Sequence, residues 1–174
     1  MSKIWLGLDN GAAGSIGIIN EDGKAKFGVI PHKLEQSYTK KEQGITRIDA
    51  KGLYDLLKHE VWSGMDENYP SNRNKVFALV ERPFTSGPEK IKAVVSGMRA
   101  LEAVLIVLEM LEIPYQYIDS KEWQKALLPE GIKGTPELKA ASLQIGTRLF
   151  PQIVSKHKDR DGLLIALYAK RKDL

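Results

Sequence analysis

The sequence predicts an α/β fold built on a five-stranded mixed sheet, in which three antiparallel strands come first and further strands then alternate with helices on both faces. Two observations lead to this prediction. The first thirty residues hold short apolar runs separated by turn residues, and the remainder alternates apolar runs with amphipathic segments. The length of 174 residues fits a single domain over 1–174.

Three short runs make the antiparallel part of this sheet. The segments 3–8, 15–20 and 25–30 are apolar, and a turn signal with Asp and Gly separates the second from the third. Residues 32–48 are polar without a clear period, and we expect a long loop there.

The rest of the chain alternates helices and strands. Asp49 can cap an amphipathic helix over 50–63, and the unbroken apolar run 76–80 is typical of a central strand that is covered on both faces. The later elements are expected as a helix over 89–112, a strand over 114–118, a short helix from Ser120, a helix capped by Thr135 that ends before Pro151, and a last helix over 160–171.

The helix over 89–112 is apolar almost all round in its C-terminal half. A helix of this kind is covered on two sides. We expect the sheet to cover one side and a second copy of the chain to cover the other, with Val107 facing outward.

Composition and charge exclude several function classes. The chain has no Cys, which excludes disulfides, thiolate zinc sites, iron–sulfur clusters and Cys nucleophiles. No apolar run approaches the roughly 18 residues of a membrane span, and no secretory segment is seen, so a cytoplasmic protein without a membrane partner is expected. Residues 1–118 hold 15 basic and 15 acidic side chains, whereas 119–174 hold 11 and 7. A basic last third is compatible with a polyanionic partner and equally with a solvated surface.

Acidic residues stand at the ends of core elements. Asp9 follows the first strand, Glu81 follows the central strand, and Asp159 and Asp161 open the last helix. If the two strands are neighbours, their C-terminal ends bring Asp9 and Glu81 together, with the last helix laid across them. Clustered carboxylates without Cys or clustered His favour Mg²⁺ or Mn²⁺, and two such ions about 4 Å apart hydrolyse phosphodiesters.

Six segments stand out in order along the chain: Gly7-Leu8-Asp9-Asn10-Gly11-Ala12-Ala13-Gly14-Ser15-Ile16-Gly17-Ile18-Ile19, Val80-Glu81-Arg82-Pro83-Phe84, Met98-Arg99-Ala100-Leu101-Glu102, Trp123-Gln124-Lys125-Ala126-Leu127, Leu138-Lys139-Ala140-Ala141-Ser142 and Asp161-Gly162-Leu163-Leu164-Ile165-Ala166-Leu167. They resemble the motifs of RuvC-type Holliday junction resolvases, in a compact form most similar to phage or prophage members.

The resemblance implies an RNase H-like fold, a homodimer, and metal-dependent cutting of branched DNA such as four-way junctions, flaps or forks in a bacterial or phage-infected cell. It implies that Asp9, Glu81 and Asp161 bind two Mg²⁺ ions, for which Mn²⁺ substitutes. Further roles follow for residues near the branch and the scissile phosphate: Phe84 would stack on a base, and Lys125 (or Lys121) and Lys139 would contact the phosphate.

Two further sites depend on the residues themselves. The family carries Asp or His three positions before its final Asp, where this chain has Lys158. Asp159 is our preferred fourth ligand because Mg²⁺ prefers carboxylate to imidazole, with His157 as the alternative. In the loop 32–48, Lys40, Lys41 and Arg47 are typical of a solvated loop, and they are also candidates for phosphate contacts because the loop leaves the sheet near Asp9.

Other functions remain open at this stage. A non-catalytic binder of branched DNA is compatible with Lys158 in the site, and an RNA-processing nuclease of the same fold differs only in substrate. The segment 7–15 also resembles the first phosphate loop of the actin and sugar-kinase superfamily, but those phosphotransferases need two such domains and 174 residues supply one.

Overall fold

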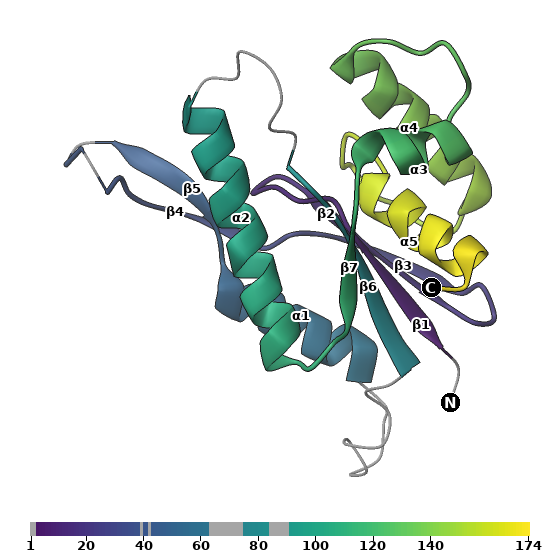
Figure 1. Ribbon diagram of the computed structural model, residues 1–174, viewed down its shortest axis with the longest axis horizontal. Coiled ribbons are helices and arrows are strands. Elements are labelled where there is room, and N and C mark those ends of the chain that lie inside the picture. The colour runs from purple at the N-terminus through teal and green to yellow at the C-terminus, as the bar shows by residue number, and fades with distance from the viewer. Residues whose placement is uncertain (1–2, 39, 42, 63–74, 84–90) are drawn as a thin grey trace.

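The computed structural model describes residues 3–38, 40–41, 43–62, 75–83 and 91–174. Its centre is a five-stranded mixed sheet in the order β3-β2-β1-β6-β7, which confirms the predicted fold class (Figure 1). The strands are β1 (Ile4–Leu8), β2 (Ser15–Asn20), β3 (Ala25–Val29), β6 (Val76–Glu81) and β7 (Tyr115–Ile118).

The pairing within the sheet brings the two acid-bearing strands side by side. β1 is antiparallel to β2 and parallel to β6, with Leu8 opposite Val80. Both strands are buried on both faces, as their unbroken apolar sequences predict. Asp9 and Glu81 therefore emerge at the same edge of the sheet.

The segment 32–48 is a β-hairpin, and the expectation of a loop was wrong. β4 (His32–Gln36) and β5 (Gly44–Ile48) form a separate two-stranded antiparallel sheet. Leu34 is 75% exposed, so the hairpin has no continuous apolar face that would produce a period-2 signal. Its strands are held by backbone hydrogen bonds and by the ion pair between Glu35 on β4 and Arg47 on β5, while Lys33 pairs with Glu35 within β4.

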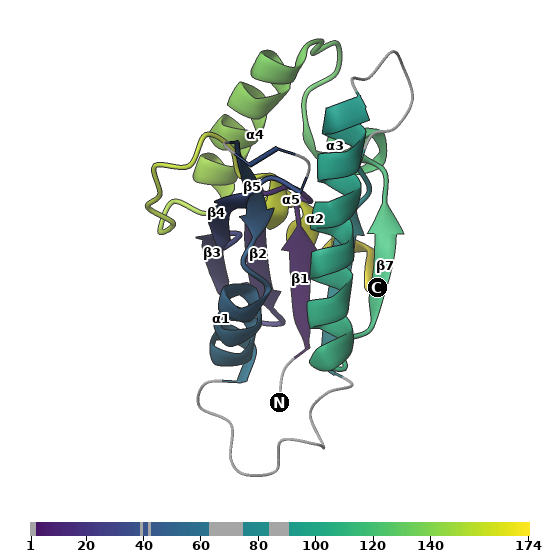
Figure 2. The same ribbon diagram turned by 90° about the vertical axis from the view of Figure 1, so that its left-hand side faces the viewer.

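Helices cover both faces of the central sheet (Figures 1 and 2). One face carries α1 (Ala50–Trp62) and α2 (Ile91–Met110), whose apolar side chains pack with the strands in the larger core cluster. The other face carries α3 (Ser120–Leu127), α4 (Thr135–Leu149) and α5 (Asp161–Lys172), which form the remaining core with Trp5 and Leu79. None of the described helices is long and apolar enough to cross a membrane.

Glycines allow α5 to lie directly on the sheet. A Cβ at Gly7 would come within 2.1 Å of the Gly162 carbonyl oxygen, and a Cβ at Gly17 within 2.3 Å of the Leu163 Cα. A Cβ at Gly162 would approach the Ser15 carbonyl oxygen to 2.4 Å. The backbone of α5 is therefore in contact with β1 and β2, and this contact fixes the position of the helix start.

Two local expectations are corrected. Val107 is buried against the core rather than outward, because the C-terminal half of α2 is apolar all round and its sequence does not distinguish the inner face. Thr135 is the first residue of α4, and Gly134 with φ of 95° occupies the cap position. Residues 89 and 90, the start of the helix predicted over 89–112, lie outside the described residues.

Candidate metal centre and cleft

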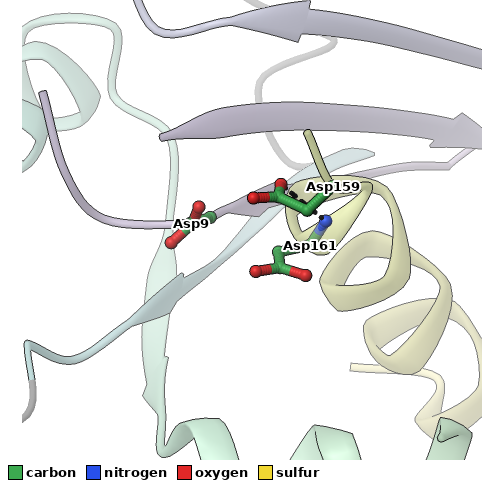
Figure 3. A group of neighbouring side chains, drawn as sticks. All are labelled: Asp9, Asp159 and Asp161. Atoms are coloured by element: carbon green, nitrogen blue, oxygen red, sulfur yellow. Dashed lines mark hydrogen bonds between the residues drawn. The ribbon is translucent and has the colours of Figure 1, made fainter. Parts of the chain in front are cut away.

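Three aspartates meet where β1 ends and α5 begins (Figure 3). Asp9 follows β1, Asp159 precedes α5, and Asp161 is the first residue of α5. One carboxylate oxygen from each lies within 4.8 Å of the others. Asp159 is fully buried and Asp161 nearly so, while Asp9 lies at the mouth of the adjoining cleft. This donor set suits a hard divalent cation.

Glu81 extends the acidic group from the end of β6. Its Oε2 accepts a 2.6 Å hydrogen bond from the Trp123 indole Nε1, and Trp123 is 1% exposed. Trp123 packs in the core and anchors α3 to it. The anchor also holds the Glu81 carboxylate in place.

The carboxylates of this centre are difficult to ionise together. Burial, followed by the charges of Asp161 and Asp159, raises the pKa of Asp9 to about 7. Burial and the Asp9 charge raise the pKa of Glu81 to about 8, although the Trp123 hydrogen bond acts in the opposite direction. Burial and Asp159 also raise the pKa of Asp161. A cation would relieve this repulsion.

The Asp161 Oδ1 atom supports the same conclusion independently. Oδ1 is buried, and it has no hydrogen-bond partner among the described residues. Buried polar atoms in folded proteins nearly always have a partner. An orphaned carboxylate oxygen that belongs to a three-acid group fits a metal ligand.

Lys139 of α4 supplies positive charge to this group. Its Nζ lies 2.7 Å from Asp159 Oδ2 and 3.6 Å from Asp161 Oδ2. Burial acts to lower the pKa of Lys139, but the hydrogen bond and charge of Asp159 outweigh it, so the pKa is raised. Lys139 is therefore a cation within the centre.

The segment before α5 is held by Arg160, a buried side chain between the two aspartates. Its guanidinium donates to the carbonyl oxygens of Ser155, His157 and Asp159 at 2.9–3.1 Å and lies over the Phe27 ring. The Arg160 backbone N–H donates to Ser142 Oγ at 3.1 Å. These bonds fix the backbone from Ser155 to Arg160, directly before α5.

His157 supports the loop that follows Asp9. Its Nε2 lies 3.2 Å from the Ala13 carbonyl oxygen, and its Nδ1 lies 3.4 Å from the Asp159 carbonyl oxygen. His157 does not belong to the three-acid group, whereas Asp159 does. Lys158 is exposed, and its charge is among those that act to lower the pKa of Asp9.

A cleft of about 790 Å³ opens beside the acids between α3 and α4. Its charged lining comprises Asp9, Glu81, Lys121, Lys125, Glu130, Lys139 and Asp161. Leu128, Ile132 and Leu138 give it an apolar wall. Three of the predicted basic residues thus line the same cleft as the acids.

The other predicted DNA contacts lie elsewhere. Lys40 and Lys41 stand in the turn of the β4–β5 hairpin and do not line the cleft. Phe84 lies outside the described residues. Ser142 and Arg160 were not identified from the sequence, because their contacts are tertiary. The one sequence signal for Arg160 is its position between two acidic residues, Asp159 and Asp161, which could have indicated that it belongs to the site.

Neither a protein-family model nor a curated protein matches the chain in sequence. Its structure is similar to that of T. thermophilus RuvC in complex with a Holliday junction substrate, with a TM-score of 0.55 and 16% identity over 98% of this chain and 96% of that one. A second structure of Thermus thermophilus RuvC has a TM-score of 0.49 and 17% identity at the same coverage. The chain therefore has the RNase H-like fold of RuvC, with a three-acid group at the end of its central strands.

Proposed function

We propose that this chain is a metal-dependent endonuclease that cuts Holliday junctions and other branched DNA by two-metal phosphodiester hydrolysis. The observation that carries the proposal is the convergence of Asp9, Asp159 and Asp161 within 4.8 Å at the end of the β1–β6 pair, in a chain with the RuvC fold. The known neighbour is bound to a Holliday junction substrate. The bacterial or phage-infected cytoplasm is where such a substrate would be met.

We assign the metal ligands to Asp9, Glu81, Asp159 and Asp161, with Mg²⁺ as the ion and Mn²⁺ as a substitute. Bound ions supply Lewis acidity and a water of lowered pKa for in-line attack on the phosphorus. The hydrogen bond from Trp123 orients Glu81, and a hydrogen bond from Arg160 to the carbonyl oxygen of Asp159 fixes the backbone of that ligand. These contacts set the ligands in place before substrate arrives.

Basic side chains along the cleft are assigned to the DNA. The exposed Lys121 and Lys125 on α3 are suited to phosphates next to the acids. Lys139 is suited to the scissile phosphate because its Nζ already lies among the acids. Phe84 is assigned to stacking at the branch point, and Lys40 and Lys41 to a DNA arm.

We also propose that the active form is a homodimer. An apolar stripe runs along the outer side of α2, formed by Ile91, Val95, Met98, Ile106 and Met110, each at least 45% exposed. Its spacing of three, four or eight residues puts the stripe on one helix face. An exposed apolar stripe of this length suits a second copy of the same helix, as a two-fold dimer requires.

Cleavage of a synthetic four-way junction tests the proposal, with duplex, flap, fork and RNA substrates of matched length beside it. We expect the junction to be cut in Mg²⁺ or Mn²⁺ and to survive in EDTA. Asp9→Asn and Asp161→Asn should each lower cleavage by more than 10²-fold, since metal activation of water is lost, while junction binding survives. Exposed Asp22→Asn is the matched control. Preferred cutting of RNA or unbranched duplex would contradict the substrate assignment.

A second candidate, a non-catalytic branched-DNA binder, is favoured by one observation. The Lys139 ammonium pairs with Asp159 at 2.7 Å, at the position where a cation would bind. Counting Mn²⁺ ions bound per chain by isothermal titration separates the two. Two ions support the nuclease, and none supports the binder.

A further inference from the structure

A groove on the opposite side of the Asp9 loop from the acidic cleft is not used by the proposed chemistry. It lies between the β4–β5 hairpin and α2 and has a volume of about 240 Å³. Its lining includes Ala12, Tyr38, Thr46, Arg47, Arg99 and Ile106. The groove is thus built from three segments that are far apart in the sequence.

An exposed tyrosine with two guanidinium groups is the main feature of this groove. Tyr38 is 65% exposed. The Arg99 guanidinium carbon lies 4.8 Å from the centre of the Tyr38 ring, and that of Arg47 lies 5.7 Å from it. Stacking and cation–π contacts therefore surround an aromatic ring that remains open to solvent.

Both arginines have unused donor capacity. Arg47 donates through Nη1 to Glu35 at 2.6 Å, which engages one of its five N–H groups. Among the described residues, the Arg99 guanidinium has no hydrogen bond or ion pair. The hairpin segment 32–48 has four basic and two acidic residues, a net charge of +2, within a part of the chain that is otherwise near neutral.

The groove is connected to the acidic centre through a short loop. Asp9 begins this loop and lies in the cleft, and Ala12 lines the groove three residues later. Asn10 Nδ2 donates to the Gly97 carbonyl oxygen at 3.3 Å, which ties the loop to α2. The loop therefore borders the cleft at Asp9 and the groove at Ala12.

The size and chemistry of the groove suit a segment of a longer nucleic-acid strand better than a small ligand. Pockets that enclose small molecules have volumes of about 300–1,000 Å³, which is more than this groove offers. Arginine forks bind phosphates, and an exposed aromatic face stacks on bases irrespective of sequence. Glu102 also lines the groove, and its negative charge repels phosphates. The binding surface is therefore the part of the groove formed by Tyr38, Arg47 and Arg99.

From these observations we infer that the groove binds a single DNA strand at the branch, with phosphates on Arg47 and Arg99 and an unpaired base on Tyr38. The inference rests on the proposed function because it names a second contact of the same substrate. According to this inference, the hairpin binds the DNA strand that is not cut. That strand passes from the metal centre across the Asp9 loop to the groove.

Salt-dependent binding tests the two arginines. Junction binding is measured by fluorescence anisotropy in EDTA at several salt concentrations. We expect Arg99→Ala and Arg47→Ala each to lower the slope of log K against log salt by about one ion, while Lys58→Ala, an exposed lysine on α1, leaves it unchanged. Melting temperature and sedimentation velocity establish that each variant is folded and has the oligomeric state of the wild type.

Base stacking tests Tyr38. The fluorescence of a junction that carries 2-aminopurine at the branch should be quenched when the protein binds. Tyr38→Leu should remove the quenching and weaken binding by between about 5-fold and 150-fold, and Tyr38→Phe should restore both, because it keeps the ring. Tyr117→Leu, an exposed tyrosine on β7, is the matched control.

The outcomes separate this inference from the proposed function. If the wild type binds and cuts the junction and the Tyr38 and arginine variants behave as their controls do, the groove assignment is wrong and the nuclease stands. If the wild type neither binds nor cuts the junction, the proposed function is wrong. The same variants and controls on single-stranded DNA then decide whether the groove binds a strand.

Discussion

Replacing Asp9 by Asn should stabilise the metal-free protein, and the gain should grow with pH. Asp9 lies beside Asp159 and Asp161, and burial together with these charges raises its pKa from 3.8 to about 7. In the unfolded chain the carboxyl ionises near 3.8, so between these two values the folded state holds a proton that the unfolded state has lost. Raising the pH through this window therefore destabilises the fold.

The magnitude follows from the pKa. Each tenfold change in proton affinity is worth about 1.4 kcal/mol, so the ionised Asp9 costs up to about 4 kcal/mol above pH 7 and about 2 kcal/mol at pH 5. Asp9 keeps some exposure at the cleft mouth, so these energies are upper bounds. An Asn side chain carries no charge, so the Asp9→Asn variant does not lose this free energy of unfolding as the pH rises. The difference of about 2–3 kcal/mol between pH 5 and pH 9 corresponds to roughly 4–12 °C in melting temperature for a chain of this size.

Differential scanning fluorimetry in EDTA from pH 5 to pH 9 measures the effect. We expect the melting temperature of Asp9→Asn to exceed that of the wild type by an amount that rises up to about pH 7–8 and then stays constant. Asp22→Asn, in the exposed β2–β3 turn, should show no such rise. Added Mg²⁺ should stabilise the wild type, most at high pH, and leave Asp9→Asn unchanged.

A gain that is equal at pH 5 and pH 9 would refute the reasoning, since the charge on Asp9 would then cost nothing. A loss of stability at pH 9 would refute it more strongly. It would mean that the carboxylate is satisfied by the protein itself and needs no cation.

Four further predictions test the centre and its surroundings. Gly162→Ala places a Cβ within 2.4 Å of the Ser15 carbonyl oxygen and should cost about 2–3 kcal/mol in chemical denaturation. Met98→Glu, at an exposed position of α2, should yield folded monomers in light scattering; a wild type that is already monomeric at micromolar concentration would contradict the dimer. Lys125→Ala should lower the salt slope of junction binding by about one ion, and an unchanged slope would remove α3 from the DNA path. Asp159→Asn should weaken Mn²⁺ binding at least tenfold in calorimetry, and wild-type affinity would exclude this residue as a ligand.

The sheet and the place of the acids could be predicted because each depends on local signals. Unbroken apolar runs over 3–8 and 76–80 indicate strands covered on both faces, and such strands lie in the middle of a sheet. An acid directly after each run is therefore expected where a central strand ends. That the two strands are neighbours, which brings Asp9 and Glu81 together, is given by their pairing in the structure.

Other features depend on contacts that no short window contains. The β4–β5 hairpin was missed because Leu34 points to solvent and ion pairs with Glu35 replace an apolar face. The inner face of α2 was misassigned at Val107 because apolar residues surround that half of the helix. The bonds that Arg160 makes to the loop before α5 join residues whose proximity depends on how that loop turns.

The hydrogen bond between Trp123 and Glu81 has a consequence for how α3 works. The inner side of this helix holds an acid of the centre through the indole, and its outer side presents Lys121 and Lys125 to the cleft. Indole Nε1 is a donor only, so the bond is strongest when Glu81 is ionised. If a phosphate binds Lys121 or Lys125 and a cation binds Glu81, as proposed, both ligands bear on this one hydrogen bond. Any coupling between them is then reciprocal, so that each ligand changes the affinity of the protein for the other by the same factor.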